Sequence, residues 1–144
     1  MLEERKIDMT RKEAREEAFR LLFETDFQSD KTPEEIYACA MESREFQEDS
    51  YLRTVYFGVQ EHREELDAMI ARHSKGWKLG RITPVSRAIL RLCIYEMLYM
   101  SDIPRAVSLN EAVELVKRFD DAKMRAFVNG LLNGAKLEIE AKAE

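Results

Sequence analysis

The sequence is poor in the residues that interrupt helices and in those that mark secreted or membrane proteins. Its 144 residues include 5 glycines, 3 prolines and 2 cysteines, and no apolar run approaches the roughly 18 residues that cross a bilayer. Cys39 and Cys93 belong to no paired motif, so we expect reduced thiols in a cytoplasmic protein. The charged N-terminus, MLEERKIDMTRKE, lacks the apolar core of a signal peptide. These absences argue against a disulfide-stabilised, secreted or membrane-spanning protein.

Motifs for catalysis or metal binding are also missing. The sequence has no glycine-rich phosphate loop, and His62 and His73 join no cluster of potential ligands. The many carboxylates have the spacing of ordinary outer helix faces. We therefore expect no enzyme activity, no catalytic residue, no metal site and no cofactor.

The sequence does contain abundant helix signals and no strand-period segment of useful length. Capping boxes begin at Thr10, Thr32 and Ser108, a further cap with proline stands at Thr83-Pro84, and Asp120 or Asp121 can cap the last helix. These signals predict helices near 10–27, 33–44, 47–73, 84–101, 108–119 and 121–141, with a short helical turn within 74–82 and a loop at 101–104. The helix at 84–101 is apolar on nearly all faces, which predicts a central buried helix. We expect residues 10–141 to form one all-α domain, preceded by a flexible extension at 1–9.

Charge is unevenly distributed along the chain. The net charge is −5, but residues 24–67 carry −9 and residues 68–136 carry +6. Such a dipolar chain can offer one face to a polyanion and another to a basic partner. Variation among solvated helices explains the same pattern, and charge alone favours that explanation.

The stretch FVNGLLNGAK at 127–136 contains Asn-Gly twice, four residues apart. Its apolar positions share one sector only if a single helix runs through both pairs. Ala126, Gly130 and Gly134 then form a ridge of minimal side chains, although each glycine costs roughly 1 kcal/mol relative to alanine. Tight helix packing is the first explanation, and a surface approached by a partner or a nucleotide is the second.

The neighbours of the ridge keep the second explanation open, and the first helix offers a separate candidate contact. Phe127 lies among cations, a combination suited to stacking an unpaired base and neutralising phosphates, although a core role for the ring stays open. Cations in the first turn of helix 10–27 oppose the helix dipole, which indicates a phosphate contact. The candidate RNA-binding residues are Arg11, Lys12, Arg15, Lys117, Arg118, Lys123, Arg125, Phe127 and Asn129.

Three segments resemble the NusB family, the bacterial transcription antitermination factors. They are RKEAREEAFRLLF at 11–23, RAILRLCIYE at 87–96 with Ile-Pro at 103–104, and SLNEAVELVKRF at 108–119 with FVNG at 127–130. The last segment matches the family's Val-x-Ile-Asn-Glu-Ala and Phe-Val-Asn-Gly signatures, with Leu109 for the usual isoleucine. Order, spacing and helical context agree from about residue 10 to 137.

The resemblance implies an all-α fold of six to seven helices in two three-helix lobes, without chemistry of its own. It implies pairing with a small-subunit ribosomal protein (NusE), binding of boxA-type single-stranded RNA, and assembly with other Nus factors on RNA polymerase, chiefly in ribosomal RNA operons. Arg11, Lys12 and Arg15 resemble one RNA-contacting region, and Phe127 with its neighbouring cations resembles the second. Because Glu13 interrupts the arginine run and the chain is acidic, we expect RNA affinity to depend on the partner.

Other residues of the matched segments have a structural explanation. A buried arginine needs paired acceptors, and Glu96, Glu111 and Glu114 are the candidates. We therefore expect a polar network that joins the lobes, formed by Arg87, Arg91, Tyr95, Glu96, Asn110 and Glu111.

Two alternative functions remain at this stage. The chain could be a helical protein-interaction domain that self-associates, because members of the family include monomers and homodimers. It could also be the detached RNA-binding module of an RNA cytosine methyltransferase, since the family's fold resembles the N-terminal domain of some of those enzymes.

Overall fold

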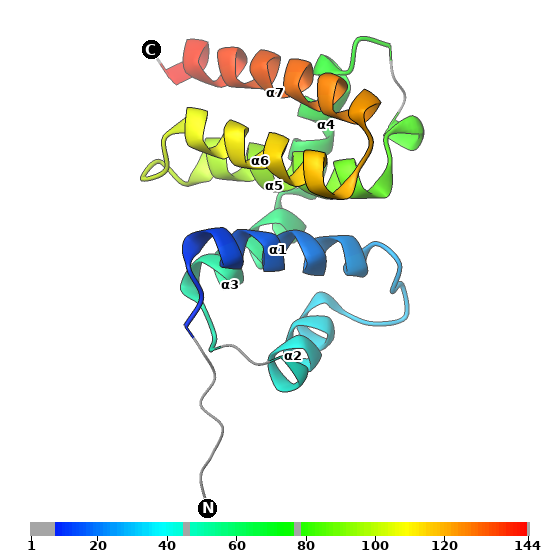
Figure 1. Ribbon diagram of the computed structural model, residues 1–144, viewed down its shortest axis with the longest axis vertical. Coiled ribbons are helices and arrows are strands. Elements are labelled where there is room, and N and C mark those ends of the chain that lie inside the picture. The colour runs from blue at the N-terminus through cyan, green and yellow to red at the C-terminus, as the bar shows by residue number, and fades with distance from the viewer. Residues whose placement is uncertain (1–7, 45–46, 77–78, 144) are drawn as a thin grey trace, which may run out of the picture. The chain divides into compact units, whose positions relative to one another are not determined.

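The computed structural model of the chain describes residues 8–44, 47–76 and 79–143. Within these residues the chain forms seven α-helices and no strand, so the prediction of an all-α protein is confirmed (Figure 1). The helices are α1 (Arg11–Thr25), α2 (Pro33–Ser43), α3 (Ser50–Glu61), α4 (Arg63–His73), α5 (Pro84–Tyr99), α6 (Arg105–Phe119) and α7 (Ala122–Ala143). A 3-10 turn, η1 (Leu79–Arg81), precedes α5 and confirms the helical turn predicted within 74–82.

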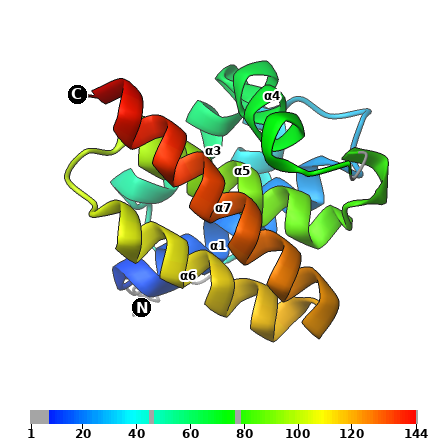
Figure 2. The same cartoon turned by 90° about the horizontal axis from the view of Figure 1, so that it is seen from above.

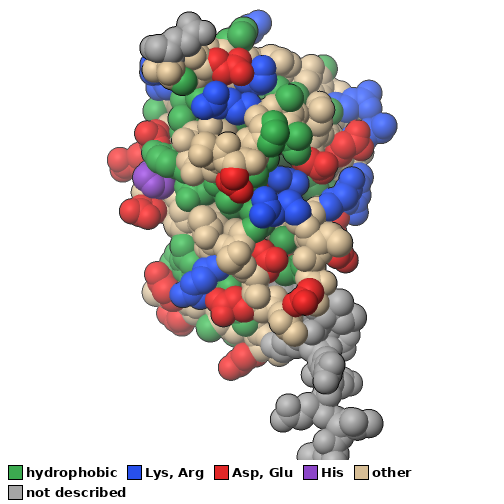
Figure 3. Space-filling model, turned by 90° about the vertical axis from the view of Figure 1, so that its left-hand side faces the viewer, with side chains coloured by type: hydrophobic (Ala, Val, Ile, Leu, Met, Phe, Trp, Pro, Cys, Tyr) green, Lys and Arg blue, Asp and Glu red, His purple; other side chains and the backbone are tan. Residues whose placement is uncertain are grey.

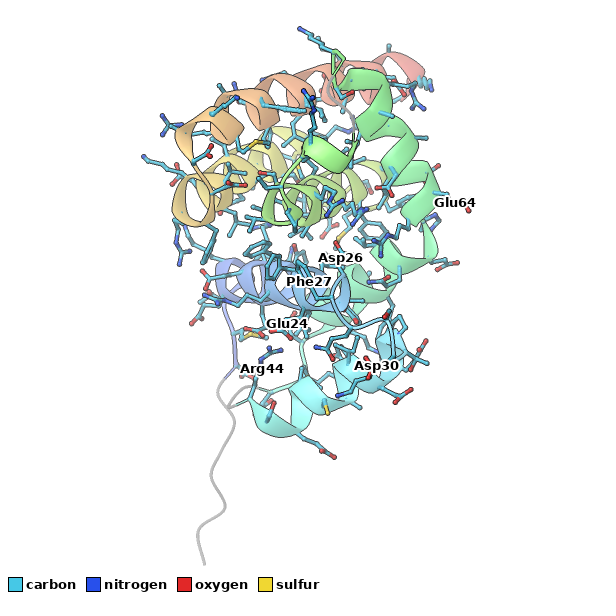
Figure 4. All side chains as sticks on the ribbon, turned by 90° about the vertical axis from the view of Figure 1, so that its right-hand side faces the viewer. Glu24, Asp26, Phe27, Asp30, Arg44 and Glu64 are labelled. Atoms are coloured by element: carbon cyan, nitrogen blue, oxygen red, sulfur yellow. The ribbon has the colours of Figure 1, made fainter. Side chains whose placement is uncertain are left out.

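The chain divides into two compact units, Met1–Gln60 and Glu61–Glu144. In the first unit, α1 packs against α2, and the completely buried Tyr56 of α3 shares a 2.7 Å hydrogen bond with Thr25. Arg44, which follows α2, forms ion pairs of 2.9 Å with Glu17 and 2.7 Å with Glu24 of α1 (Figure 4). These contacts tie the three helices of the first unit together.

In the second unit, α5 is the central helix, as its apolar composition predicts. Nearly all of its residues from Ser86 to Met97 are buried, and it packs against α4, α6 and α7. Figure 2 shows α7 lying over α5, with α6 on one side and α4 on the other. This arrangement places the C-terminal part of α4 beside α7.

Side-chain caps begin most of these helices where the sequence predicts them. Thr10 and Thr32 form complete capping boxes with Glu13 and Glu35, and the Thr83 hydroxyl accepts from the Ser86 amide at 3.1 Å. The carboxylate of Asp121 accepts from the Met124 amide at 2.9 Å and so caps α7. Each cap satisfies an amide that the first helical turn leaves without a backbone partner.

The single helix predicted for residues 47–73 is wrong, because it is two helices that meet at His62. The backbone of His62 leaves the helical region, with φ −103° and ψ 17°, and its ring stacks on Tyr99 with centroids 4.2 Å apart. A break of one residue hardly changes the phase of an apolar stripe, so periodicity does not reveal it. The second unit therefore contains four α-helices, and the first contains three.

The helix start predicted at Ser108 is also wrong. α6 begins at Arg105, one turn earlier, directly after Pro104. Ser108 is buried inside the helix, and its hydroxyl donates to the Glu96 carboxylate at 2.8 Å. A serine three residues before a glutamate imitates a cap in sequence, but here it serves a contact between α5 and α6.

No helix in the described part of the chain is long and apolar enough to cross a membrane. Of the extension predicted at 1–9, residues 1–7 lie outside the described residues, and residues 8–9 are not helical. Within the helical turn predicted at 74–82, residues 77–78 also lie outside them.

Candidate nucleic-acid interface

The last helix runs unbroken through both Asn-Gly pairs, as its apolar pattern predicts. α7 extends from Ala122 to Ala143, and its buried positions include Val128, Leu131 and Leu132. The amide group of Asn133 donates to the Asn129 carbonyl at 2.8 Å. This bond covers a backbone oxygen on the exposed side of the helix, beside the glycines.

The two glycines of this helix have different surroundings. A Cβ atom added at Gly134 would lie 2.8 Å from Nδ1 of His73 on α4, so the absence of a side chain lets the histidine ring approach the α7 backbone. A Cβ atom added at Gly130 would meet no atom of the described residues within 4 Å, apart from its own stretch of helix. Helix packing therefore explains Gly134 and does not explain Gly130.

Gly130 borders a cavity of about 210 Å³, which we call the aromatic cavity. Phe127 is half-buried and forms part of its wall. The cavity lies between α7 and the C-terminal end of α4, and the described residues that line it are His73, Ser74, Lys75, Ala126, Phe127, Gly130 and Leu131. An aromatic ring beside a bare stretch of helix backbone is a suitable surface for stacking a flat ligand.

A second, larger cavity of about 550 Å³ adjoins the first, and we call it the cationic cavity. The described residues that line it are Lys75, Gly76, Arg81 and Lys123. Lys75 belongs to both linings, and Lys123 precedes Phe127 by one turn of α7. The two cavities therefore follow one another along the N-terminal half of α7.

The wall shared by α4 and α7 is held in place by an ion-pair cluster. The carboxylate of Glu138 on α7 contacts the side-chain nitrogens of Arg72 at 2.7 Å, His73 at 2.8 Å and Lys142 at 3.2 Å. The hydrogen bonds from Arg72 and His73 lower the pKa of Glu138 from 4.5 to about 2. Because His73 also lines the aromatic cavity, this cluster fixes one side of that cavity.

The remaining predicted residues of the second unit lie on the surface of α6 and α7. Lys117, Arg118, Arg125 and Asn129 are exposed, and the Arg118 guanidinium lies 4.9 Å from the centroid of the Phe119 ring. Only Lys123 and Phe127 of the predicted set line the two cavities. On the face shown in Figure 3, basic and acidic side chains are interspersed rather than gathered into a single patch.

The three predicted cations of α1 have different environments within the first unit. Arg11 is exposed, with its guanidinium 4.6 Å from the centroid of the Tyr51 ring, and Lys12 is exposed beside it. Arg15 is only 5% exposed, and its guanidinium lies 5.5 Å from the same ring. Arg11 and Lys12 are therefore accessible to a ligand, whereas Arg15 supports Tyr51.

The expected polar network has a different acceptor at its centre. Arg91, 5% exposed, donates to Asp67 of α4 at 2.8 and 3.1 Å, and Asp67 is not among the acceptors expected from the sequence. Glu96 is buried with Ser108, and the ring of Tyr95 lies 5.2 Å from that of Tyr99. Of the other expected members, Asn110 is exposed, Glu111 is half-buried, and Nε of Arg87 is buried without a hydrogen-bond partner among the described residues.

Among the lining residues that sequence reasoning missed are His73, Lys75 and Arg81. His73 is the last residue of α4, and Lys75 and Arg81 belong to the segment between α4 and α5, where no periodicity marks them. Both Lys75 (φ 50°) and Gly76 (φ 91°) have a positive φ, a conformation that is uncommon for lysine. The pair Lys-Gly directly after a helix is the one local signal that could have drawn attention to this turn.

The chain belongs to the NusB family, because the family model "NusB family" matches residues 12–136. The transcription antitermination protein NusB of Bacillus velezensis is 47% identical over 133 residues, which cover 92% of this chain and 100% of that protein. The resemblance found in the sequence is thereby confirmed.

Solved structures agree with this assignment. A NusB structure from T. maritima superposes with a TM-score of 0.82 and 30% identity, covering 92% of this chain and 94% of that one. A chain from a crystal structure of the antitermination factors NusB and NusE in complex with dsRNA superposes with a TM-score of 0.79 and 27% identity, covering 89% and 96%.

Proposed function

We propose that this protein is a transcription antitermination factor, a non-enzymatic adaptor that binds RNA. Together with a small-subunit ribosomal protein of the NusE type, it binds boxA-type single-stranded RNA and joins other Nus factors on RNA polymerase, chiefly in ribosomal RNA operons. The protein acts in the cytoplasm. Its membership of the NusB family and the likeness to a NusB chain solved with NusE and RNA support the proposal.

The observation that carries the proposal is the open half of α7. Phe127 presents a half-buried ring to the aromatic cavity, and Gly130 leaves the adjoining backbone bare. Lys75, at the edge of the same cavity, and Lys123, one turn before the ring, supply positive charge. A ring for a base beside cations for phosphates is the arrangement by which proteins hold single-stranded nucleic acid.

This geometry favours an unpaired base over a duplex. Bases of a helix are stacked on one another and cannot lie against a protein ring, whereas bases of a single strand can be splayed out. The solved NusB–NusE complex contains dsRNA, so a duplex of the same sequence is the informative competitor. We expect single-stranded RNA to bind more tightly than that duplex.

The α1 cations form a second region of the proposed RNA surface. Arg11 and Lys12 are exposed and take the role of phosphate contacts. Arg15 takes a positioning role, because its buried guanidinium packs with Tyr51, over which Arg11 also lies. Lys117, Arg118, Arg125 and Asn129 complete the proposed RNA-binding set as exposed contacts on α6 and α7.

The test is RNA binding by a Phe127→Ala variant, measured with and without the ribosomal partner. Stacking of one base on an aromatic ring contributes about 1–3 kcal/mol, so we expect affinity to fall roughly 5- to 150-fold. Phe27→Ala is the matched control, since Phe27 is 63% exposed and lines neither cavity. Thermal unfolding of both variants checks that each is folded.

Two results would contradict the proposal. One is equal binding of boxA and scrambled RNA by the wild type with the partner present. The other is a Phe127→Ala variant that is folded and binds boxA RNA as tightly as Phe27→Ala. Light scattering over a dilution series accompanies the titration, because a homodimer that opens for neither partner nor RNA would instead favour a self-associating domain.

A further inference from the structure

The cationic cavity has features that the stacking surface does not explain. Three of its four described lining residues carry a positive side chain, and none is acidic. Lys75 and Arg81 form no ion pair within the described part of the chain. Cations brought together around one hollow repel each other unless an anion or solvent screens them.

The helix dipoles account for only part of this arrangement. Lys75 follows the C-terminal end of α4, where a positive charge is favourable. Lys123 lies in the first turn of α7, which contains no acidic residue. A cation at a helix N-terminus costs a few tenths of a kcal/mol, and the Asp121 carboxylate that caps α7 offsets part of that cost.

The backbone of the turn also suits a close approach. Gly76 lines the cavity with φ +91°, and among the described residues no atom beyond its chain neighbours lies within 4 Å of the position that a side chain would occupy. An arginine, two lysines and a bare backbone around one hollow are the groups that bind phosphate oxygens.

The position of the cavity identifies the source of the phosphate. Lys123 and Phe127 are four residues apart on α7, a rise of about 6 Å, which is comparable to the length of one nucleotide in an extended strand. Lys75 borders both cavities. A strand whose base lies in the aromatic cavity therefore brings a neighbouring phosphate to the cationic cavity.

We propose that Lys75, Arg81 and Lys123 form a phosphate-binding subsite for the RNA nucleotide that adjoins the base stacked on Phe127. The proposal rests on the proposed function and adds two residues, Lys75 and Arg81, to its RNA surface. The turn between α4 and α5 thereby sets the path of the strand along α7.

The first experiment measures RNA binding by the full chain with its ribosomal partner, using Lys75→Gln/Arg81→Gln. The control is Arg20→Gln/Lys31→Gln, which removes the same two kinds of charge from exposed positions outside both cavities. We expect about tenfold weaker binding for the cavity variant at physiological salt, and a decrease of roughly 0.7–1.4 in the slope of log Kd against log salt. An equal effect of the two double variants would overturn the proposal.

The second experiment locates the phosphate by replacing one RNA phosphate at a time with a neutral methylphosphonate. In the wild type we expect one position next to the stacked base to weaken binding, and in Lys75→Gln/Arg81→Gln the same replacement has no further effect. Additive losses at every position would show that the cavity does not hold that phosphate.

The third experiment separates an RNA subsite from a site for free phosphate. Inorganic phosphate is titrated into the ¹⁵N-labelled protein, and amide shifts of Gly76 and Lys123 are followed. Suppose that the amide shifts saturate with phosphate but no single methylphosphonate loses its effect in Lys75→Gln/Arg81→Gln. That result would indicate a site for free phosphate and contradict the proposal. If the wild-type protein does not bind RNA, the proposed function is refuted. If Phe127→Ala binds RNA more weakly but Lys75→Gln/Arg81→Gln binds it as tightly as the wild type, only the subsite is refuted.

Discussion

The two halves of α7 differ although they share the same residue pattern. In the C-terminal half, α4 covers the helix, so that His73 approaches Gly134 and pairs with Glu138. In the N-terminal half, no described residue outside the helix itself approaches Gly130, which lines the aromatic cavity together with Phe127. Gly134 therefore allows α4 to pack against α7, whereas Gly130 leaves a space beside α7 that helix packing does not fill.

This difference shows that a repeated motif does not imply a repeated cause. Glycine within a helix costs roughly 1 kcal/mol relative to alanine at either position. At Gly134 the cost is offset by the packing of α4 against α7. At Gly130 no contact with the described residues offsets it, which is why the proposed function places a ligand there.

Gly134→Ala should produce the largest change in stability. The added methyl group meets the His73 ring, which Glu138 holds at 2.8 Å, and the overpacking outweighs the better helix propensity. We expect a loss of about 1–2 kcal/mol in the free energy of unfolding, measured with urea. In a His73→Ala background the same substitution should become neutral or stabilising. If Gly134→Ala stabilises the wild type, α4 moves away from α7 at little energetic cost and the overpacking argument is contradicted.

Gly130→Ala should have the opposite sign. Within the described part of the chain, no atom outside the local helix lies within 4 Å of the new methyl group, so we expect a gain of about 0.5–1 kcal/mol in the free energy of unfolding. The same methyl group narrows the aromatic cavity, so RNA affinity should fall a few-fold. A variant that is more stable and binds RNA unchanged would mean that no ligand approaches this backbone; Gly134→Ala is the matched substitution one turn away.

Glu138→Gln should have the smallest effect, and one that depends on pH. The pKa of Glu138 is about 2 in the folded protein against 4.5 ordinarily. The stability from this ionised carboxylate is therefore present above pH 4.5 and is lost as the pH falls through about 2. We expect the variant to lose about 0.5 kcal/mol at pH 7, because surface ion pairs contribute little. Urea unfolding at pH 7, 4.5 and 2.5 should show the difference from wild type shrinking with acidification, and a constant difference would contradict this account.

Much of the fold can be predicted from local sequence signals, above all from helix caps. The caps at Thr10, Thr32, Thr83 and Asp121 act where they are predicted, because a cap needs only residues a few positions apart. The break at His62 is not readable in this way, since its stacking on Tyr99 joins residues 37 positions apart.

The candidate site is readable only in part. The pattern around Phe127 selects Lys123 because both belong to one helix, whereas Lys75 and Arg81 reach the same surface from another segment of the chain. Burial likewise changes the role of Arg15, which a helical wheel places beside Arg11 but cannot place against Tyr51.

By itself, the sequence determined that this protein is helical, where most of its helices begin, that α5 is its central helix, and that it resembles the NusB family. These properties depend on neighbours along the chain and on apolar periodicity, which any window of the sequence contains. Only the tertiary structure decided which glycine is covered, which acid pairs with Arg91, and that the turn after α4 brings its cations to α7. Those outcomes depend on contacts between distant segments, and such contacts exist only once the helices have packed.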